Sequence, residues 1–226
     1  MKIGVFGTGI VGQTLAGKLA ELGHDVVIGT RDPKVTLART EKDAMGFGPF
    51  RDWHATHDKV KLVTLGETAK HGELFFNVLN GQGAVEGLRA AGEDALAGKV
   101  LVDVTNPLDF SKGFPPSLLV CNTDSLGEQL QRAFPKARVV KSLNTLNCNL
   151  MVHPGNLAEE TDVFVSGNDP VAKADTVELL KSFGWKRIHD LGDITSARGT
   201  EMWLPMWLRL MGSLKTADFN VRIVTR

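Results

Sequence analysis

The sequence predicts a doubly wound α/β fold, in which helices cover both faces of a mostly parallel β-sheet and a small helix-and-strand appendage follows at the carboxyl end. Strand-like and helix-like segments alternate along the chain, and several strands are continuously apolar, as in sheets buried on both faces. In addition, a glycine-rich turn joins the first strand to the first helix. Together these observations are typical of Rossmann-like domains.

The glycine-rich turn is Gly7-Thr8-Gly9-Ile10-Val11-Gly12, between an apolar strand at 2–6 and a helix with apolar residues at helical spacing. Gly7 allows a tight turn, Gly9 lets the backbone approach a pyrophosphate, and Gly12 lets the helix pack closely on the strand. Amide groups at the start of the helix would face that anion. A glycine turn that binds nothing is the alternative. The context favours dinucleotide contacts at Gly7, Thr8, Gly9, Ile10, Val11 and Gly12.

The residues after the second strand, 25–28, indicate which dinucleotide binds. Gly29 omits the carboxylate that would repel a 2′-phosphate. Thr30 offers a hydroxyl and Arg31 a planar cation that suits phosphate. This combination favours NADP over NAD.

Two charged residues beyond Arg31 keep other interpretations open. Lys34, together with Thr8, could add to the phosphate contacts. If the strand extends further, Asp32 could instead be the carboxylate that binds the ribose of NAD. As a separate alternative, Arg31 could be an ordinary surface arginine.

The other elements follow from the same apolar periodicity. The charged, poorly periodic stretch 33–58 is expected to be a loop with one short helix. Strands are expected at 61–65, 74–79, 100–104, 138–143, 162–165 and 186–189. Helices are expected at 67–72, 84–96, 125–134 and 171–183.

Three turns that follow strands carry amide and hydroxyl groups: 80–83, 105–108 and 144–147. Because the carboxyl ends of parallel strands meet at one edge of the sheet, these turns are expected on one rim, where ligands bind. Amides and hydroxyls suit a ribose and a nicotinamide carboxamide, although the same residue types also favour turns by themselves. The sequence thus predicts cofactor contacts at Asn80, Gly81, Thr105, Asn106, Pro107, Asn144 and Thr145.

The strongly apolar stretch 200–214 has tryptophans on one stripe and Pro205 near its start, so a kinked helix is expected. It could be a deeply buried helix, a homodimer contact or one wall of a second pocket. Residues 219–224 could form a final edge strand. We therefore divide the chain into an NADP-binding domain, 1–192, and an appendage, 193–226.

Composition narrows the class of protein. Lys plus Arg and Asp plus Glu number 26 each among 226 residues, so no nucleic-acid or membrane-surface partner is expected. No apolar run approaches the roughly 18 residues of a membrane span, and no signal peptide is expected before the first strand. Cys121 and Cys148 lack metal-ligand spacing and are expected to be reduced thiols in a cytoplasmic protein.

No arrangement of residues predicts a general acid or base, and we assign no catalytic residue. His54 and His57 are interpreted as surface histidines, and His153 could border the nicotinamide but is expected to be structural or solvated. The chain has no tyrosine, which excludes a tyrosine-based dehydrogenase. Carbonyl reduction needs a proton donor, whereas hydride transfer between two planar rings needs mainly alignment. A hydride shuttle between NADP(H) and a ring cofactor is therefore expected.

The chain resembles the coenzyme F420-dependent NADP oxidoreductases and also the related NADPH-binding domains of membrane ferric reductases. Motifs at 7–12, 28–31, 102–107, 139–145 and 190–198 carry the resemblance. It implies an NADP(H) site at the first two motifs. It also implies hydride exchange with a small-molecule acceptor, either the deazaflavin F420, a flavin (FMN or FAD) or a metal ion, near 106–107 and 144–148.

One departure leaves the acceptor open. The F420 enzymes are expected to have a histidine at the position of Asn144 and small residues at the positions of Asn147 and Cys148. The Asn-Thr pair at 144–145 is more similar to the ferric-reductase branch. An NADP(H)-binding redox sensor without turnover is the alternative function, and a carbonyl or imine reductase ranks last. The acceptor pocket is expected at Leu108, Leu146, Asn147, Cys148, Trp203 and Trp207.

Overall fold

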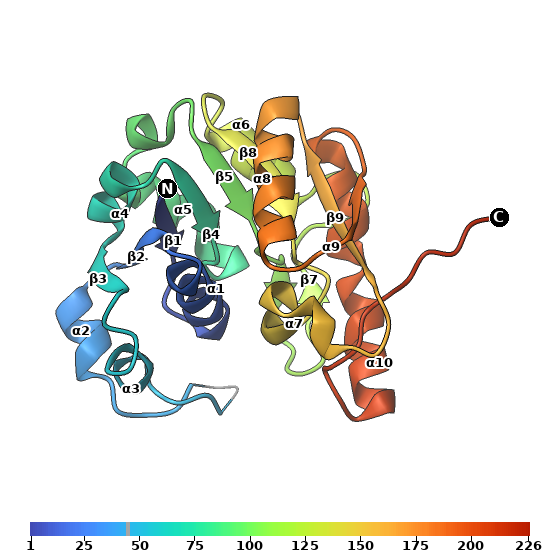
Figure 1. Ribbon diagram of the computed structural model, residues 1–226, viewed down its shortest axis with the longest axis horizontal. Helices are drawn as coiled ribbons and strands as arrows, with labels where there is room; N and C mark the ends of the chain where they lie inside the picture. Colours follow the sequence, from blue (N-terminus) through green and yellow to red (C-terminus); the bar gives the residue numbers. More distant parts are fainter. Residues whose placement is uncertain (44–45) are drawn as a thin grey trace.

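The computed structural model describes residues 1–43 and 46–226. Within this part of the chain, eight strands form one sheet in the order β10-β9-β8-β5-β4-β1-β2-β3 (Figure 1). Neighbouring strands are parallel except β8 and β9, which are antiparallel. The strands are β1 (Lys2–Phe6), β2 (Asp25–Thr30), β3 (Lys61–Thr64), β4 (Leu74–Asn77), β5 (Val100–Asp103), β8 (Arg138–Ser142), β9 (Asp162–Gly167) and β10 (Arg187–Asp190). The predicted fold class is confirmed.

Helices cover both faces of the sheet (Figure 1). A separate cluster of apolar side chains is buried on each face. One face carries α1 (Ile10–Glu21), α3 (Phe50–His54), α7 (Cys148–Val152) and α8 (Pro170–Ser182). The other carries α4 (Leu65–His71), α5 (Ala84–Ala91), α6 (Leu126–Ala133) and α9 (Ala197–Met202). The remaining elements are α2 (Pro33–Ala38), α10 (Leu204–Leu214), the short pair β6 (Leu108–Asp109) and β7 (Ser117–Leu118), and 3₁₀ turns at Gly81–Gly83, Glu93–Leu96, Pro154–Asn156 and Ile194–Ser196.

The strand order reverses between β1 and β4. The chain moves from β1 through β2 to β3 on one side, and from β4 through β5 to β8 on the other. In open α/β sheets the ligand crevice lies beyond the carboxyl ends of the strands at such a reversal. The glycine turn after β1 and the turn after β4 both lie at this point.

Several expected boundaries were wrong for local reasons. The second strand continues through Thr30 rather than ending at 28, and the stretch 33–58 contains two helices, α2 and α3, rather than one. The expected helix 84–96 is shorter in the structure, because α5 ends at Ala91 and Gly92 has a φ of 103°, outside the helical region. A 3₁₀ turn follows at Glu93–Leu96. The β6–β7 hairpin was not expected.

The prediction for the carboxyl-terminal residues was also wrong in part. The expected helix 200–214 is interrupted at Trp203 and restarts with Pro205 in the first turn of α10, where a missing N–H is tolerated. Residues 219–224 form no strand. Among the described residues, one hydrogen bond between backbone atoms joins this tail to β9, from Asp162 N to Val221 O at 2.9 Å, and it does not continue as a strand pairing. Among the described residues, none of the helices is both long and apolar enough to cross a bilayer.

Candidate functional site

The three glycines of the first turn differ in their surroundings. Gly7 has a φ of 119°, and a Cβ atom there would lie 2.8 Å from the Val78 carbonyl oxygen. A Cβ atom on Gly12 would lie 2.0 Å from the Gly7 carbonyl oxygen, which is too close for any side chain. Gly9 instead faces open space and begins α1 without a side-chain cap. The turn therefore packs tightly at both ends and leaves its middle accessible, as an anion-binding helix start requires.

A groove of about 860 Å³ extends from this turn across the ends of β2 and β4. Thr30 is the last residue of β2, and its Oγ1 lies 2.8 Å from Thr36 Oγ1. Arg31 is exposed and lines the groove. From the first turn and the turn after β4, Gly7, Thr8, Gly9 and Asn80 also line it.

Asp32 and Gly29 lie close to Arg31 in the sequence, and the structure gives each of them a structural role that the sequence did not predict. The Asp32 carboxylate caps α2, because its Oδ1 accepts hydrogen bonds from Lys34 N at 2.8 Å and Val35 N at 3.1 Å. A Cβ atom on Gly29 would lie 2.3 Å from Thr68 Oγ1, so packing alone excludes a carboxylate there. Lys34 lies in the first turn of α2 and is not among the residues that line the groove.

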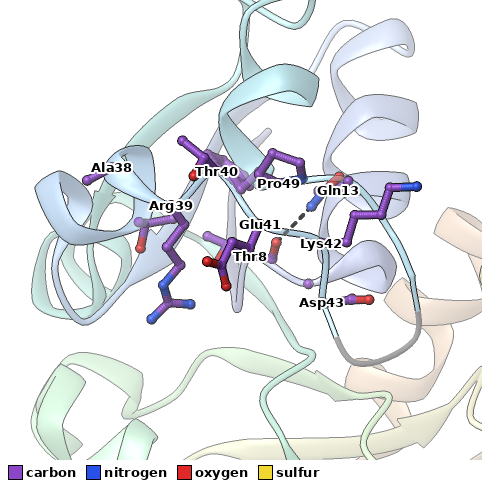
Figure 2. A pocket seen from close by; sticks show the side chains of 13 residues that line it. Thr8, Gln13, Ala38, Arg39, Thr40, Glu41, Lys42, Asp43 and Pro49 are labelled. Carbon is purple, nitrogen blue, oxygen red and sulfur yellow. Dashed lines mark hydrogen bonds between the residues drawn. The ribbon is translucent and has the colours of Figure 1, made fainter.

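Arg39 is a candidate that the sequence analysis missed. It follows α2 and lines both the groove and an adjacent cavity of about 580 Å³ (Figure 2). Thr8 and Gln13 also line this cavity, where Gln13 Nε2 donates to the Thr8 carbonyl at 2.9 Å (Figure 2). No motif includes Arg39, and only its charge and its closeness to Arg31 in the sequence could have indicated it.

A smaller cavity of about 210 Å³ lies at the strand reversal, between the turns that follow β4 and β5. The two turns touch there, since a Cβ atom on Gly81 would lie 2.1 Å from the Asn106 carbonyl oxygen. Of the described residues that line this cavity, none is an acid, a base or a thiol. The lining consists of Val11, Val78, Leu79, Asn80, Gly81, Val104, Thr105, Asn106, Leu108 and Phe110.

The third rim turn is tied to the second by a pair of amides. Asn106 Nδ2 donates to the Asn144 carbonyl at 2.9 Å, and Asn144 Nδ2 donates to Asn106 Oδ1 at 3.0 Å. Asn144 is buried, and Leu143 before it has a φ of 62°, a left-handed conformation that is strained for leucine. Thr145 and Pro107 are also buried, so Asn106 is the accessible member of this group.

A buried ion cluster lies directly beneath the turn at 105–106. Lys141 Nζ donates to Asp103 Oδ2 at 2.8 Å, to the Thr105 carbonyl at 2.5 Å and to Glu201 Oε1 at 2.8 Å. All three charged side chains are at most 1% exposed. Burial lowers the pKa of Lys141, but the two carboxylates outweigh it, so its pKa is raised above the usual value and the ammonium stays charged. The sequence analysis assigned no role to these residues.

The residues expected to form the acceptor pocket do not all meet at one cavity. Leu108 lines the small cavity, whereas Asn147 caps α7 and binds the carboxyl-terminal tail through Ala217 O at 2.5 Å and Asp218 Oδ1 at 3.0 Å. Trp207 stacks on Phe219 of that tail, with ring centroids 5.4 Å apart. Leu146 is buried, and Cys148 and Trp203 are half-buried.

The histidines lie outside this arrangement. His54 Nε2 lies 3.1 Å from Val60 O, and His57 stacks on Trp53, so both pack a loop rather than forming a site. His153 is exposed at the end of α7. Across residues 1–43 and 46–226, His, Cys, Asp and Glu side chains form no group that could hold a metal ion.

Comparisons with known proteins agree with this geometry. The family model for coenzyme F420-dependent NADP oxidoreductases matches residues 2–107. A crystal structure of a candidate F420-dependent NADP reductase from Arthrobacter sp. FB24 is 56% identical over 100% of both chains, with a TM-score of 0.96. A reductive aminase from Aspergillus terreus, at 19% identity and a TM-score of 0.64 over 94% of this chain and 62% of its own, shares the fold.

Two curated relatives represent the two branches. The F420-dependent NADP reductase of Methanothermobacter marburgensis is 26% identical over 99% of this chain and 98% of its own. Metalloreductase STEAP3 of Rattus norvegicus is 28% identical over 91% of this chain, which spans only 38% of the length of that protein. The resemblance predicted from the motifs is confirmed, and the chain belongs to the family of coenzyme F420-dependent NADP oxidoreductases.

Proposed function

We propose that this protein transfers a hydride between NADP(H) and a planar ring acceptor, with the deazaflavin F420 the first candidate and a flavin (FMN or FAD) the second. A chelated ferric ion accepts single electrons rather than a hydride, so it would be reduced by the flavin that has received the hydride. One observation carries the proposal. The cavity at the strand reversal is lined by amide, hydroxyl and apolar groups, with no ionisable proton donor among its described lining residues. A carbonyl reductase needs such a donor for the nascent alkoxide, whereas transfer between two rings does not.

In this proposal, the large groove holds the adenosine end and the small cavity holds the nicotinamide end. Arg31 and the Thr30 hydroxyl bind the 2′-phosphate, and the open middle of the glycine turn receives the pyrophosphate at the start of α1. Bound NADP(H) would supply the hydride chemistry. The chain orients the nicotinamide through Asn80 and Asn106, while Leu108 shields it from water.

Stopped-flow absorbance tests the proposal. Enzyme and NADPH are mixed separately with F420, FMN and ferric chelates, and the loss of NADPH absorbance is followed. The expected result is acceptor-dependent oxidation, fastest with F420 and slower when NADH replaces NADPH. Absence of turnover with every acceptor contradicts the enzyme proposal.

A non-catalytic NADP(H) sensor is the second candidate function. The observation that favours it is the tail bound to Asn147, because residues 217–219 occupy space beside the turn that would border the acceptor. A sensor would bind NADPH without losing its absorbance to any acceptor. For a sensor, the full-length chain should bind NADPH and show no acceptor-dependent oxidation, whereas the enzyme should oxidise NADPH as the full-length chain.

We also propose that α10, within the appendage 193–226, contacts a second copy of the chain. Met206 and Leu214 of this helix are 53% and 54% exposed. A contiguous exposed apolar patch often marks a protein interface, and the proposal requires Met206 and Leu214 to belong to such a patch. Sedimentation at micromolar concentration should give a dimer, and substituting Met206→Glu should give a monomer. A wild-type monomer removes this proposal and leaves the hydride-transfer proposal untouched.

A further inference from the structure

The buried cluster of Lys141, Asp103 and Glu201 is hard to explain by stability alone. Removing three charged groups from water is costly, and well-packed apolar replacements of buried ion pairs are often neutral or stabilising. Here one cation faces two carboxylates, and Glu201 also needs amide hydrogen bonds from Leu126 N at 2.8 Å and Gly127 N at 3.0 Å. The role of the cluster is therefore inferred from the groups to which it is hydrogen-bonded.

The cluster binds every polar atom of Thr105. Asp103 Oδ1 accepts from Thr105 Oγ1 at 2.7 Å and from Thr105 N at 3.3 Å, while Lys141 Nζ donates to Thr105 O. Asp103 is fixed in turn by Asn77 Nδ2 at 2.9 Å. Because an ammonium has three donors and all three are used, Lys141 has one geometry in which it satisfies its partners.

Thr105 transmits this fixed position to the cavity. The next residue, Asn106, forms the reciprocal amide pair with Asn144 and lies against Gly81. A displacement of the Thr105 carbonyl would therefore shift Asn106 relative to both other rim turns. The turns after β4 and β5 line the cavity that we assign to the nicotinamide ring, and the turn after β8 holds Asn106 from behind. The part of the larger groove around Arg31, which we assign to the adenosine end, is lined instead by residues of β2 and α2.

We propose that Lys141 is a positioning residue for hydride transfer, which through the Thr105 carbonyl holds Asn106 where it aligns the nicotinamide ring. This inference rests on the proposed function for the location of the ring. Lys141 is buried under the turn and acts through Thr105 and Asn106. Its ammonium sets ring alignment, and the adenosine end sets most of the affinity.

The first test compares Lys141→Met with Leu180→Ala, a truncation of a buried core residue of α8 that lines neither the groove nor the small cavity. Three quantities are measured below the unfolding temperatures: the dissociation constant for NADPH, the fluorescence lifetime of bound NADPH, and the single-turnover rate with the fastest wild-type acceptor among F420, FMN and ferric chelate. The lifetime reports how rigidly the nicotinamide is held.

For Lys141→Met we expect a dissociation constant within about threefold of wild type, a lifetime displaced toward that of free NADPH, and a rate about 10²-fold lower, because small misplacements of reacting groups have effects of that size. For Leu180→Ala we expect wild-type values of all three despite its lower stability. A wild-type lifetime and rate in Lys141→Met overturn the proposal. Equal losses in Leu180→Ala do so as well, since they would show a general loosening.

A second variant covers the case in which Lys141→Met does not fold. Combining Lys141→Met with Asp103→Asn and Glu201→Gln leaves no unpaired buried charge, so the chain should fold. The same loss of lifetime and rate is expected, because the Thr105 carbonyl still lacks its ammonium donor. Wild-type values in this variant overturn the proposal. If the wild type binds NADPH but oxidises it with no acceptor, the proposed enzyme fails while the lifetimes still decide the role of Lys141.

Discussion

The two ends of the candidate site are built in opposite ways. At the proposed adenosine end, Arg31 is exposed, and the Thr30 hydroxyl lies 2.8 Å from the Thr36 hydroxyl. At the proposed nicotinamide end, Thr105 and Asn144 are buried and their polar groups are held by other residues of the chain. Recognising a phosphate needs an accessible charge, whereas aligning a ring needs fixed geometry. Substitutions at the first end should therefore change binding, and substitutions at the second should change stability or catalysis.

The largest expected effect is on stability at the nicotinamide end. Glu201→Ala removes one carboxylate from the buried cluster and leaves two α6 amides without acceptors. Unfolding in urea should show a loss of about 3–5 kcal/mol, as for other broken buried ion pairs. The control Glu67→Ala, which removes the exposed capping-box glutamate of α4, should cost much less, because this carboxylate stays in water. An equal loss of unfolding free energy in the two variants would contradict a large contribution of the buried cluster to stability.

Substitutions at two glycines of the first turn should have different effects, one on the stability of the fold and the other on NADPH binding. Gly12→Ala places a methyl group 2.0 Å from the Gly7 carbonyl oxygen, and should cost about 3 kcal/mol of folding free energy. Gly9→Ala meets open space and has an ordinary φ of −69°, so its stability should stay within about 0.5 kcal/mol of wild type. Titration should nevertheless show weaker NADPH binding in Gly9→Ala. Unchanged NADPH affinity in this variant contradicts the pyrophosphate position.

At the adenosine end, Arg31→Ala should weaken binding of NADPH by about 1.5–3 kcal/mol, the range for a charge-assisted hydrogen bond, and leave NADH binding unchanged. Its melting temperature should equal that of wild type, since the side chain is exposed. Lys34→Ala is the matched control, because Lys34 is not among the groove-lining residues, and we expect a change in NADPH affinity of less than about threefold. Equal weakening for NADPH and NADH in Arg31→Ala would refute the phosphate contact.

The smallest effect concerns an exposed ion pair close to the buried one. Asp124 precedes α6, and its hydrogen bonds to Arg132 lower the pKa of its carboxyl to about 2. A lowered pKa stabilises the fold above the usual value of 3.8, and that stabilisation is lost as the pH falls toward 2. Asp124→Asn should cost about 1 kcal/mol at neutral pH, since Arg132 is largely exposed.

Urea unfolding of Asp124→Asn and wild type at several pH values checks this. The difference between the two should shrink toward zero near pH 2. Glu86→Gln, in the exposed pair with Arg89, should show almost no difference at any pH. A difference for Asp124→Asn that does not depend on pH would rule out the ion pair as its cause.

Local sequence patterns predicted the groove around Arg31 better than the contacts at the strand reversal. Strand, glycine turn and helix are encoded within a few neighbouring residues, so the fold class and the position of Thr30 and Arg31 at the groove followed from periodicity and residue type. The boundary errors came from single residues whose backbone conformation overrides periodicity, such as Gly92 with its φ of 103°.

The ties that hold the nicotinamide end join residues far apart in the chain. Asn106 and Asn144 are separated by 38 positions, as are Asp103 and Lys141. These pairs arise from the register of β5 with β8, which aligns Asp103 with Lys141. No local pattern specifies that register, so the sequence indicated amide-rich turns but not that two of them bind each other.

The most direct test of the account is calorimetric titration of the wild-type chain with NADPH and with NADH. If Arg31 recognises the 2′-phosphate, NADPH binding should release heat. The dissociation constant for NADPH should be at least about tenfold lower than that for NADH. No heat with NADPH, or equal affinity for the two dinucleotides, would contradict it.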